Sequence, residues 1–437
     1  QLLARDLELL NSDGPGARLF PDHETLPYDP FSPHPDIIAS RLTALAGLPG
    51  MERGLLLTSI SALLQRLPPA AYITQRSFSL ATGDALVIET FRRRLEHAGY
   101  EASEQVYQAG QFAVRGSVVD LFPAGSATPY RIDLFDEEIE SIREFDPDSQ
   151  RSTGRVDAID LLPAREYPCD ESGLDAFRRA FRNRFDVDTR HVNLYQDLRA
   201  GVHPQGLEQY LPLFYGETSC LLDYLANEPH LVLQDGVPEA ARDLSRRTHE
   251  RWEQRRHDVE RPILEPGELF FSTDEIVERL DELEQTSLPA ADVPAPRTPR
   301  FATRQPPDLH IHERGKEPAA ALLGFIEEFS GRVLFAADTP GRREVLRTTL
   351  ASFGIQPEVC ASFSEFRAGP ARIGLAVLPV DEGFICSDTE HDELALLTES
   401  QLFGGRSRPK AERRSSERDP ESIIRNLTDL AAGAPVV

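Results

Sequence analysis

An arginine and a phenylalanine share one face of a predicted strand within this 437-residue chain. Side chains alternate between the two faces of a strand. The segment Tyr130–Phe135 (YRIDLF) therefore places Arg131, Asp133 and Phe135 together, opposite the apolar positions. Arginine and aromatic side chains are enriched at the energetic centres of protein–protein interfaces. The pattern is typical of a partner-binding surface; the alternative is that Phe135 is an exposed side chain that only caps a neighbouring loop.

The sequence carries no motif for nucleotide hydrolysis or acyl transfer. A phosphate-binding loop has the pattern GxxxxGK[ST], in which backbone amides hold phosphates while Lys and Ser/Thr serve phosphate and magnesium. The Gly315-Lys316 pair is followed by Glu317 and lacks the upstream glycine, and no GxSxG is present. The acidic run 136–138 resembles a magnesium site only superficially, because it has no phosphate loop to face. We interpret it as a hairpin connection, and we predict no catalytic residue.

Two groups of residues could bind a metal ion, and both are weak candidates. His310 and His312 lie on one face of an extended segment but lack a third ligand, and such pairs more often face solvent. Asp22, His23 and Glu24 are adjacent, and adjacent side chains rarely converge on one site. We therefore expect no metal and no cofactor in this chain.

The elements that must position Arg131 and Phe135 are short strands. Pro123, Gly125 and Pro129 interrupt the segment before Tyr130. A helix is predicted over Leu86–His97, capped by Thr82 or Asp84 and ended by Gly99. One helix followed by antiparallel strands predicts a small α+β domain over residues 79–163. The predicted strands are Val114–Phe122, Tyr130–Phe135, Ile139–Phe145 and a closing strand at Val156–Leu162.

Composition restricts the possible partners and compartment. The formal net charge is −25, so a nucleic-acid contact would need a local basic patch or another chain. The four cysteines are scattered without a CxxC pair, which favours reduced thiols in a cytosol. No apolar run reaches membrane-spanning length and no signal sequence is seen, so we expect a soluble, cytoplasmic protein with no membrane partner. The start at Gln1 inside a helix-like pattern suggests a piece of a longer chain.

The remaining chain alternates helices and strands. Residues 1–78 and 164–300 have α/β character, and 301–307 end a proline-rich linker. Residues 308–404 have strand–helix alternation that predicts a small parallel, flavodoxin-like sheet. Residues 405–437 read as a basic tether at 406–418 and a helix at 420–431. The predicted elements outside 79–163 are helices at Pro35–Leu45, Val237–Arg256, Glu275–Glu284, Ala319–Phe329 and Arg342–Phe353, and strands at Gly54–Ser59, His230–Leu233, Val333–Ala337, Ile373–Leu378 and Leu394–Leu397.

Several long blocks resemble one protein family. They are FPDHETLPYDPFSPHPDIIASRL, MERGLLLTSISALLQRLPP, QFAVRGSVVDLFPAG, PYRIDLFDEEIESIREFDPDSQRS and LLTESQLFG. In this order they are similar to the N-terminal region of bacterial transcription-repair coupling factors, which itself resembles the excision-repair protein UvrB. The chain departs from the family at His23, where the motif often has Trp. From the resemblance we also expect that the opening segment of the first domain is not included in this sequence.

The resemblance implies a multi-domain α/β architecture. Residues 1–78 and 164–300 would form a degenerate helicase-like (RecA-like) domain without ATP hydrolysis, and 79–163 an inserted domain that binds UvrA. Residues 308–404 would be a domain of unassigned role, and 405–437 would lead toward an RNA-polymerase-interacting domain. The ATP- and magnesium-dependent motor, which acts on double-stranded DNA, would lie outside this chain.

The resemblance also assigns the UvrA contacts. They fall on Arg115 from VRGSVVD and on Arg131 and Phe135 from PYRIDLF. This supports the interface interpretation of Phe135, and it implies that the face is masked in the resting full-length protein but open in this fragment. The alternatives are a UvrB-like ATP-dependent damage-recognition helicase, which the absent phosphate loop disfavours, and an acidic scaffold whose partner is RNA polymerase.

Overall fold

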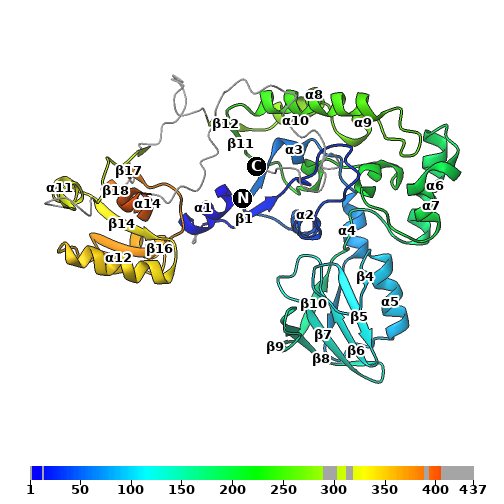
Figure 1. Cartoon of the computed structure of the whole chain (residues 1–437), viewed down its shortest axis with the longest axis horizontal. Coiled ribbons are helices and arrows are strands. Elements are labelled where there is room, and N and C mark those ends of the chain that lie inside the picture. The colour runs from blue at the N-terminus through cyan, green and yellow to red at the C-terminus, as the bar shows by residue number, and fades with distance from the viewer. Residues whose placement is uncertain (1, 12–13, 289–302, 312–317, 388–392, 405–437) are drawn as a thin grey trace, which may run out of the picture. The chain divides into compact units, whose positions relative to one another are not determined.

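The computed structural model describes residues 2–11, 14–288, 303–311, 318–387 and 393–404. These residues fall into two compact units. The larger contains 18–52 and 56–288, and the smaller contains 53–55 with the described residues up to 17 and from 303 onward. Each unit combines helices with sheets (Figure 1), so the predicted mixed α/β, multi-sheet character is confirmed.

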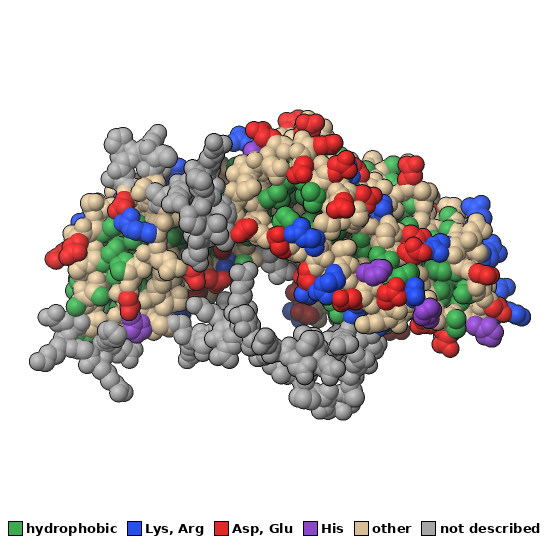
Figure 2. All heavy atoms as spheres, turned by 90° about the horizontal axis from the view of Figure 1, so that it is seen from above, with side chains coloured by type: hydrophobic (Ala, Val, Ile, Leu, Met, Phe, Trp, Pro, Cys, Tyr) green, Lys and Arg blue, Asp and Glu red, His purple; other side chains and the backbone are tan. Residues whose placement is uncertain are grey.

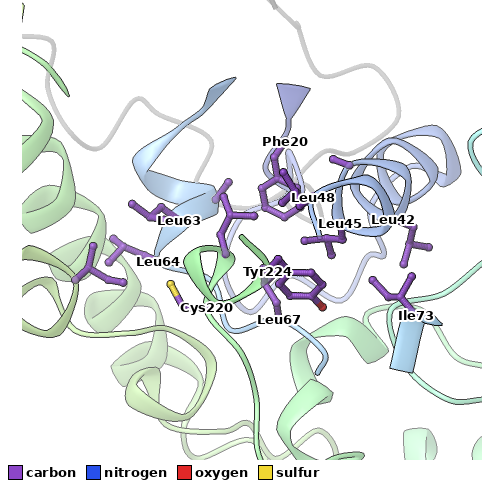
Figure 3. Close-up of a cluster of buried hydrophobic side chains, with 14 of the residues drawn as sticks. Phe20, Leu42, Leu45, Leu48, Leu63, Leu64, Leu67, Ile73, Cys220 and Tyr224 are labelled. Atoms are coloured by element: carbon purple, nitrogen blue, oxygen red, sulfur yellow. The ribbon is translucent and has the colours of Figure 1, made fainter. Parts of the chain in front are cut away.

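A first apolar core of the larger unit forms around α2 (Pro35–Gly47). Pro35 starts the helix with a preset φ, and the spacing of Ile38, Leu42 and Leu45 puts these side chains on one buried face. Figure 3 shows Leu42 and Leu45 in one cluster with Tyr224, which comes from a distant part of the sequence. The predicted helix at 35–45 is therefore confirmed. The neighbouring elements are β1 (Ala17–Phe20), β2 (Leu55–Thr58), α3 (Ile60–Leu63) and α4 (Ala70–Arg76).

A second core of the larger unit is aromatic. Phe177 and Phe181 of α6 (Glu171–Arg184) pack against Tyr210 and Phe214. The predicted long helix is confirmed as α8, and the predicted strands 54–59 and 230–233 appear as β2 and β11, each in a two-stranded sheet. The other elements here are α7 (Asn193–Arg199), β11 (Leu231–Gln234), α8 (Val237–Arg255), α9 (Pro266–Leu269), α10 (Thr273–Asp281), β12 (Gln285–Leu288) and 3-10 turns at Thr189–His191, Leu207–Leu213 and Leu221–Tyr224.

A six-stranded sheet with one helix forms the part of the larger unit that holds the candidate site. The strand order is β4-β5-β6-β7-β8-β9, and α5 lies against one face of the sheet (Figure 1). Phe91 and Leu95 of α5 pack there on Val119 and Ile132. The strands and helix are β4 (Glu101–Ala102), β5 (Gln111–Arg115), β6 (Val118–Leu121), β7 (Tyr130–Phe135), β8 (Glu138–Phe145), β9 (Ser152–Val156) and α5 (Ile88–His97).

Two local predictions for this domain are corrected, and a third is confirmed. The stretch 114–122 is a hairpin, not one strand, because Gly116 has φ +62° and reverses the chain between β5 and β6. Neither Thr82 nor Asp84 caps α5; Asp84 instead accepts a hydrogen bond from the backbone N–H of Ala81. The closing strand predicted at 156–162 is confirmed as β10 (Ala158–Leu161), and it pairs with β3 (Phe78–Ala81).

The smaller unit is built on a second six-stranded sheet. The central strand β14 runs parallel to β16 and β18, and the buried residues Val333, Phe335 and Leu397 lie in its core. The predicted strands 333–337, 373–378 and 394–397 are confirmed. Its elements are α1 (Leu2–Leu10), β13 (Thr303–Arg304), α11 (Ala320–Glu328), β14 (Arg332–Ala337), α12 (Pro340–Ser352), β15 (Glu358–Val359), α13 (Phe363–Ala368), β16 (Ile373–Val377), β17 (Phe384–Ser387), β18 (Glu393–Thr398) and α14 (Glu399–Phe403).

The flavodoxin-like prediction for this sheet is wrong. A flavodoxin sheet has its first strand beside its second, in the order 2-1-3-4-5. Here the order is β13-β17-β18-β14-β16-β15, so β15 lies at the edge beyond β16, and β17 and β13 add antiparallel pairs. Alternation along the chain revealed the strands but not their spatial order, and β15 is too short to be recognised. The predicted tether at 406–418 and helix at 420–431 lie outside the described residues, as does most of the linker.

Candidate partner-binding surface

The face of the six-stranded sheet that points away from α5, here called the outer face, carries all three predicted binding residues. Residues directly opposite each other on paired strands share a face. Arg115 is opposite Val118, which is opposite Asp133. Asp120 is likewise opposite Arg131. The two arginines therefore lie on one face, separated by β6.

Asp120 joins the two arginines. Its side chain is fully buried, and Arg131 donates to it through Nε to Oδ1 at 2.6 Å and Nη2 to Oδ2 at 2.9 Å. Arg115 donates to the same carboxylate through Nη2. The hydrogen bonds to Asp120 raise the pKa of Arg131, outweighing the lowering caused by burial. Because two-pronged pairing fixes the plane of a guanidinium, Asp120 holds Arg131 in one orientation.

The surroundings of the two arginines differ. The Arg131 guanidinium lies 5.0 Å from the centre of the Phe145 ring, and its Nη1 donates to the carbonyl oxygen of Gln150 at 3.3 Å. Its side chain is 19% exposed, whereas that of Arg115 is 45% exposed. Arg115 is thus the more accessible of the two cations. Arg131 is mostly buried, and its guanidinium is held in a fixed orientation.

Phe135 is the most exposed large apolar side chain among the described residues, at 70%. It is the last residue of β7, directly before Asp136, whose φ of +54° starts the turn into β8. The alternation predicted for this strand is confirmed, because Ile132 and Leu134 are buried on the α5 face. A ring left in water contributes little to folding, and burying it against a partner would contribute about 1.5–3 kcal/mol.

Arg115 and Phe135 lie at the same end of the sheet. β5 and β7 are both antiparallel to β6, and Asp133, which shares a register row with Arg115, is two residues before Phe135. Sequence reasoning placed Arg115 on the strand adjacent to β7; the hairpin puts it one strand further away. Sequence reasoning also missed Asp120, although a lone carboxylate at an outward position of an apolar strand was a usable signal.

A second acidic residue organises the middle of the outer face. Asp133 Oδ2 accepts hydrogen bonds from Ser141 Oγ at 2.8 Å and from Arg143 Nη2 at 2.5 Å. The positive charge of Arg143 is therefore paired with the carboxylate of Asp133 on the outer face. The predicted hairpin connection at 136–138 is confirmed, since Asp136 and Glu137 form the turn and Glu138 begins β8.

The domain is anchored to the rest of the larger unit by a buried ion pair. Glu166 accepts from Arg41 Nε at 2.7 Å and lies 2.9 Å from His23 Nε2. Burial alone would raise the pKa of Glu166, but Arg41 and His23 lower it to about 2. Tyr215 also donates its hydroxyl to the Glu166 carbonyl at 2.9 Å. The chain leaving the domain is thus fixed to α2.

The other candidate motifs do not form sites. Asp22 accepts from Ser61 Oγ at 2.6 Å while His23 turns to Glu166, so this acidic run does not converge. The partner of His310 in the predicted pair, His312, lies outside the described residues. The described ranges hold no cluster of three or more metal-ligating side chains. None of the helices in those ranges could cross a lipid bilayer, given their length and polarity.

Comparison with known proteins matches two family models to this chain. Residues 78–167 match the UvrB interaction domain, and residues 325–402 match the MFD D3 domain. The outer face, with Arg115, Arg131 and Phe135, lies inside the first match.

Full-length relatives extend the similarity to nearly the whole chain. Transcription-repair-coupling factors of Haemophilus influenzae and Escherichia coli are each 38% identical over 421 residues, covering 96% and 95% of this chain. The Bacillus subtilis factor is 28% identical over 454 residues. The chain spans 36% of the length of each of these relatives. It belongs to the transcription-repair coupling factor family and corresponds to the N-terminal region that contains the UvrB interaction domain and the MFD D3 domain.

Proposed function

We propose that this chain is the non-catalytic N-terminal module of a transcription-repair coupling factor and that it recruits UvrA. In the complete protein, it would bring UvrA to RNA polymerase stalled at a DNA lesion, for nucleotide excision repair. ATP, magnesium and double-stranded DNA would be handled by a translocase motor outside this chain. Residues 1–78 and 164–300 would be the two parts of a degenerate RecA-like domain that does not hydrolyse ATP.

One observation carries the proposal. The domain that matches the UvrB interaction domain exposes Phe135 at the end of β7 and carries the half-exposed Arg115 at the same end of the sheet, with β6 between the two strands. Interface hot spots are enriched in aromatic and arginine side chains that lose their water when the partner binds. Asp120 would act through the arginines as a positioning residue.

The direct test is the affinity of this chain for purified UvrA, measured by isothermal titration calorimetry. Phe135→Ala is expected to weaken binding by about thirtyfold, because a hot-spot truncation costs about 2 kcal/mol. Its matched control is Tyr107→Ala, which removes another exposed aromatic side chain (54%) from the same domain. Tyr107→Ala should leave the affinity within about twofold.

The arginines are tested in the same assay. Arg115→Ala and Arg131→Ala should each weaken binding, whereas Arg92→Ala, on the α5 side of the sheet, should not. Arg131→Ala also leaves Asp120 with a single partner, so its unfolding in urea is measured in parallel to separate binding from stability. Unchanged affinity for both Phe135→Ala and Arg131→Ala would rule out the outer face as the UvrA site.

A further inference from the structure

A basic cavity of about 510 Å³ opens beside α5, and neither the outer face nor the anchor uses it. It is bounded by α4, β3 and α5, and the residues that carry the argument are Gln75, Arg76, Phe78, Arg93, Arg94 and His97. None of the described residues lining it is Asp or Glu. This is unusual in a chain with 72 acidic and 47 basic residues. Elsewhere on the unit, acidic side chains are interspersed with arginines, as Figure 2 shows for one face.

Arg94 is positioned without using its hydrogen-bond donors. Its guanidinium lies 3.5 Å from the centre of the Phe78 ring, and Phe78 in turn meets Phe91 edge-on at 6.3 Å. Within the described part of the chain, Arg94 pairs with no carboxylate. Stacking holds the guanidinium plane while its N–H groups, which lie in that plane, stay available.

The neighbouring cations are only partly neutralised. Arg93 Nε lies 4.0 Å from the Glu89 carboxylate, and its two terminal nitrogens have no partner among the described residues. His97 lines the cavity one turn beyond Arg93. By contrast, Arg92, which does not line the cavity, donates to Glu96 at 3.0 Å. Arg76 of α4 also lines the cavity, but it is already paired with the carboxylate of Asp170. Arg93 and Arg94 are therefore the two guanidinium groups left to bind a ligand.

We propose that this cavity is a phosphate-binding site. Guanidinium groups match the geometry of phosphate oxygens, and two neighbouring guanidinium groups favour a compact polyanion. The volume is that of a small-ligand pocket, which suits a phosphate group better than the flat surface of an acidic protein. The phosphate belongs either to a nucleic-acid backbone or to a free nucleotide. In an acidic chain this pocket is the kind of local basic patch through which nucleic acid could make contact. The inference is independent of the proposed UvrA site.

The test uses the whole chain and four probes: inorganic pyrophosphate, a mononucleotide, a fluorescein-labelled 20-nucleotide single strand and a poly-glutamate peptide. We expect the phosphate probes to bind and Arg94→Ala and Arg93→Glu each to weaken them at least about tenfold, since a hydrogen bond to a charged group contributes that much. Arg92→Ala, on the same helix, is the control and should change binding less than about twofold. Circular dichroism checks that the variants fold.

The arms identify the source of the phosphate. Tighter binding of the oligonucleotide than of the small probes, with a strong salt dependence, indicates a nucleic-acid backbone; equal or tighter binding of the mononucleotide indicates a nucleotide. The proposal is overturned if no phosphate probe binds, if Arg92→Ala weakens binding as much as Arg94→Ala, or if poly-glutamate competes as well as the oligonucleotide.

Discussion

Asp120 and Glu166 are buried carboxylates with a common role: each holds arginine in place. A buried charge is tolerated only when paired, and removing one partner commonly costs about 3–5 kcal/mol because the other charge is stranded. Asp120 fixes the arginines of the outer face, and Glu166 fixes the junction where the domain rejoins the unit. Removing either carboxylate is therefore expected to lower the free energy of unfolding, and removing Asp120 would also disturb the arginines of the candidate surface.

Glu166 predicts a specific acid sensitivity. Its pKa is lowered from 4.5 to about 2 by Arg41 and His23, against the effect of burial. Because the folded value lies below the unfolded one, the stabilisation is fully present above about pH 4.5 and is lost as the pH falls toward 2, by about 1.4 kcal/mol per pH unit. This pH-dependent stabilisation is measured by comparing the urea unfolding of the wild type and of Glu166→Gln from pH 7 to pH 3.

The variant isolates this carboxylate from the other acidic residues of the chain. Glu166→Gln should be much less stable than wild type at pH 7, and the difference should narrow below pH 4.5. A stability difference that stays constant down to pH 3 would mean that Glu166 does not titrate as its buried ion pair requires.

At the scale of elements, two tight turns position the candidate residues. Arg115 is followed by the turn at Gly116 and Phe135 by the turn at Asp136, and both turn residues have positive φ. These turns set where each strand ends and hence which side chain stands at the end of the sheet. A substitution at either turn residue therefore tests whether the positive φ is needed.

Gly116→Ala is expected to destabilise the larger unit by about 1 kcal/mol. Its φ is +62° and an added Cβ would meet no atom within 4 Å, so the cost is backbone strain alone. Gly50→Ala is the control, because that position is equally open and has no positive φ. It should change stability by less than about 0.5 kcal/mol. Equal effects of both substitutions on urea unfolding would show that the turn is not strained.

The sequence predicted those features that depend on local pattern. The helix at 35–45, the long helix at 237–256 and the alternation in 130–135 follow from spacing and capping, and the structure has them. The face shared by Arg131 and Phe135 follows from the same alternation. The roles assigned to these residues in binding UvrA rest on family resemblance.

Contacts between distant segments could not be predicted. No local pattern shows that Asp120 forms ion pairs with both arginines, or that Glu166 pairs with Arg41, 125 positions away in the sequence. The position of β15 at the edge of its sheet is likewise not encoded locally. The hairpin at Gly116 was missed because the run VRGSVVDLF is apolar enough to suggest one long strand. The basic pocket depends on which faces of α4 and α5 meet, which spacing does not fix.

At the scale of the whole molecule, the two units have separate hydrophobic cores, so we predict two calorimetric transitions. Leu346→Ala empties part of the smaller unit's core and should lower one transition by roughly 10 °C or more. Leu42→Ala, equally buried in the larger unit, should lower the other. If either variant shifted a single common transition, the units would not unfold independently.

The chain contains one tryptophan, Trp252, which lies in α8 and packs against the aromatic core of the larger unit. The indole lies near His249 and the guanidinium of Arg256, so its emission is sensitive to that setting. Excitation that selects indole over phenol would therefore produce emission from the larger unit alone. Binding at either candidate site could therefore be followed by the change in tryptophan emission of the larger unit, which carries both sites, without a fluorescent label.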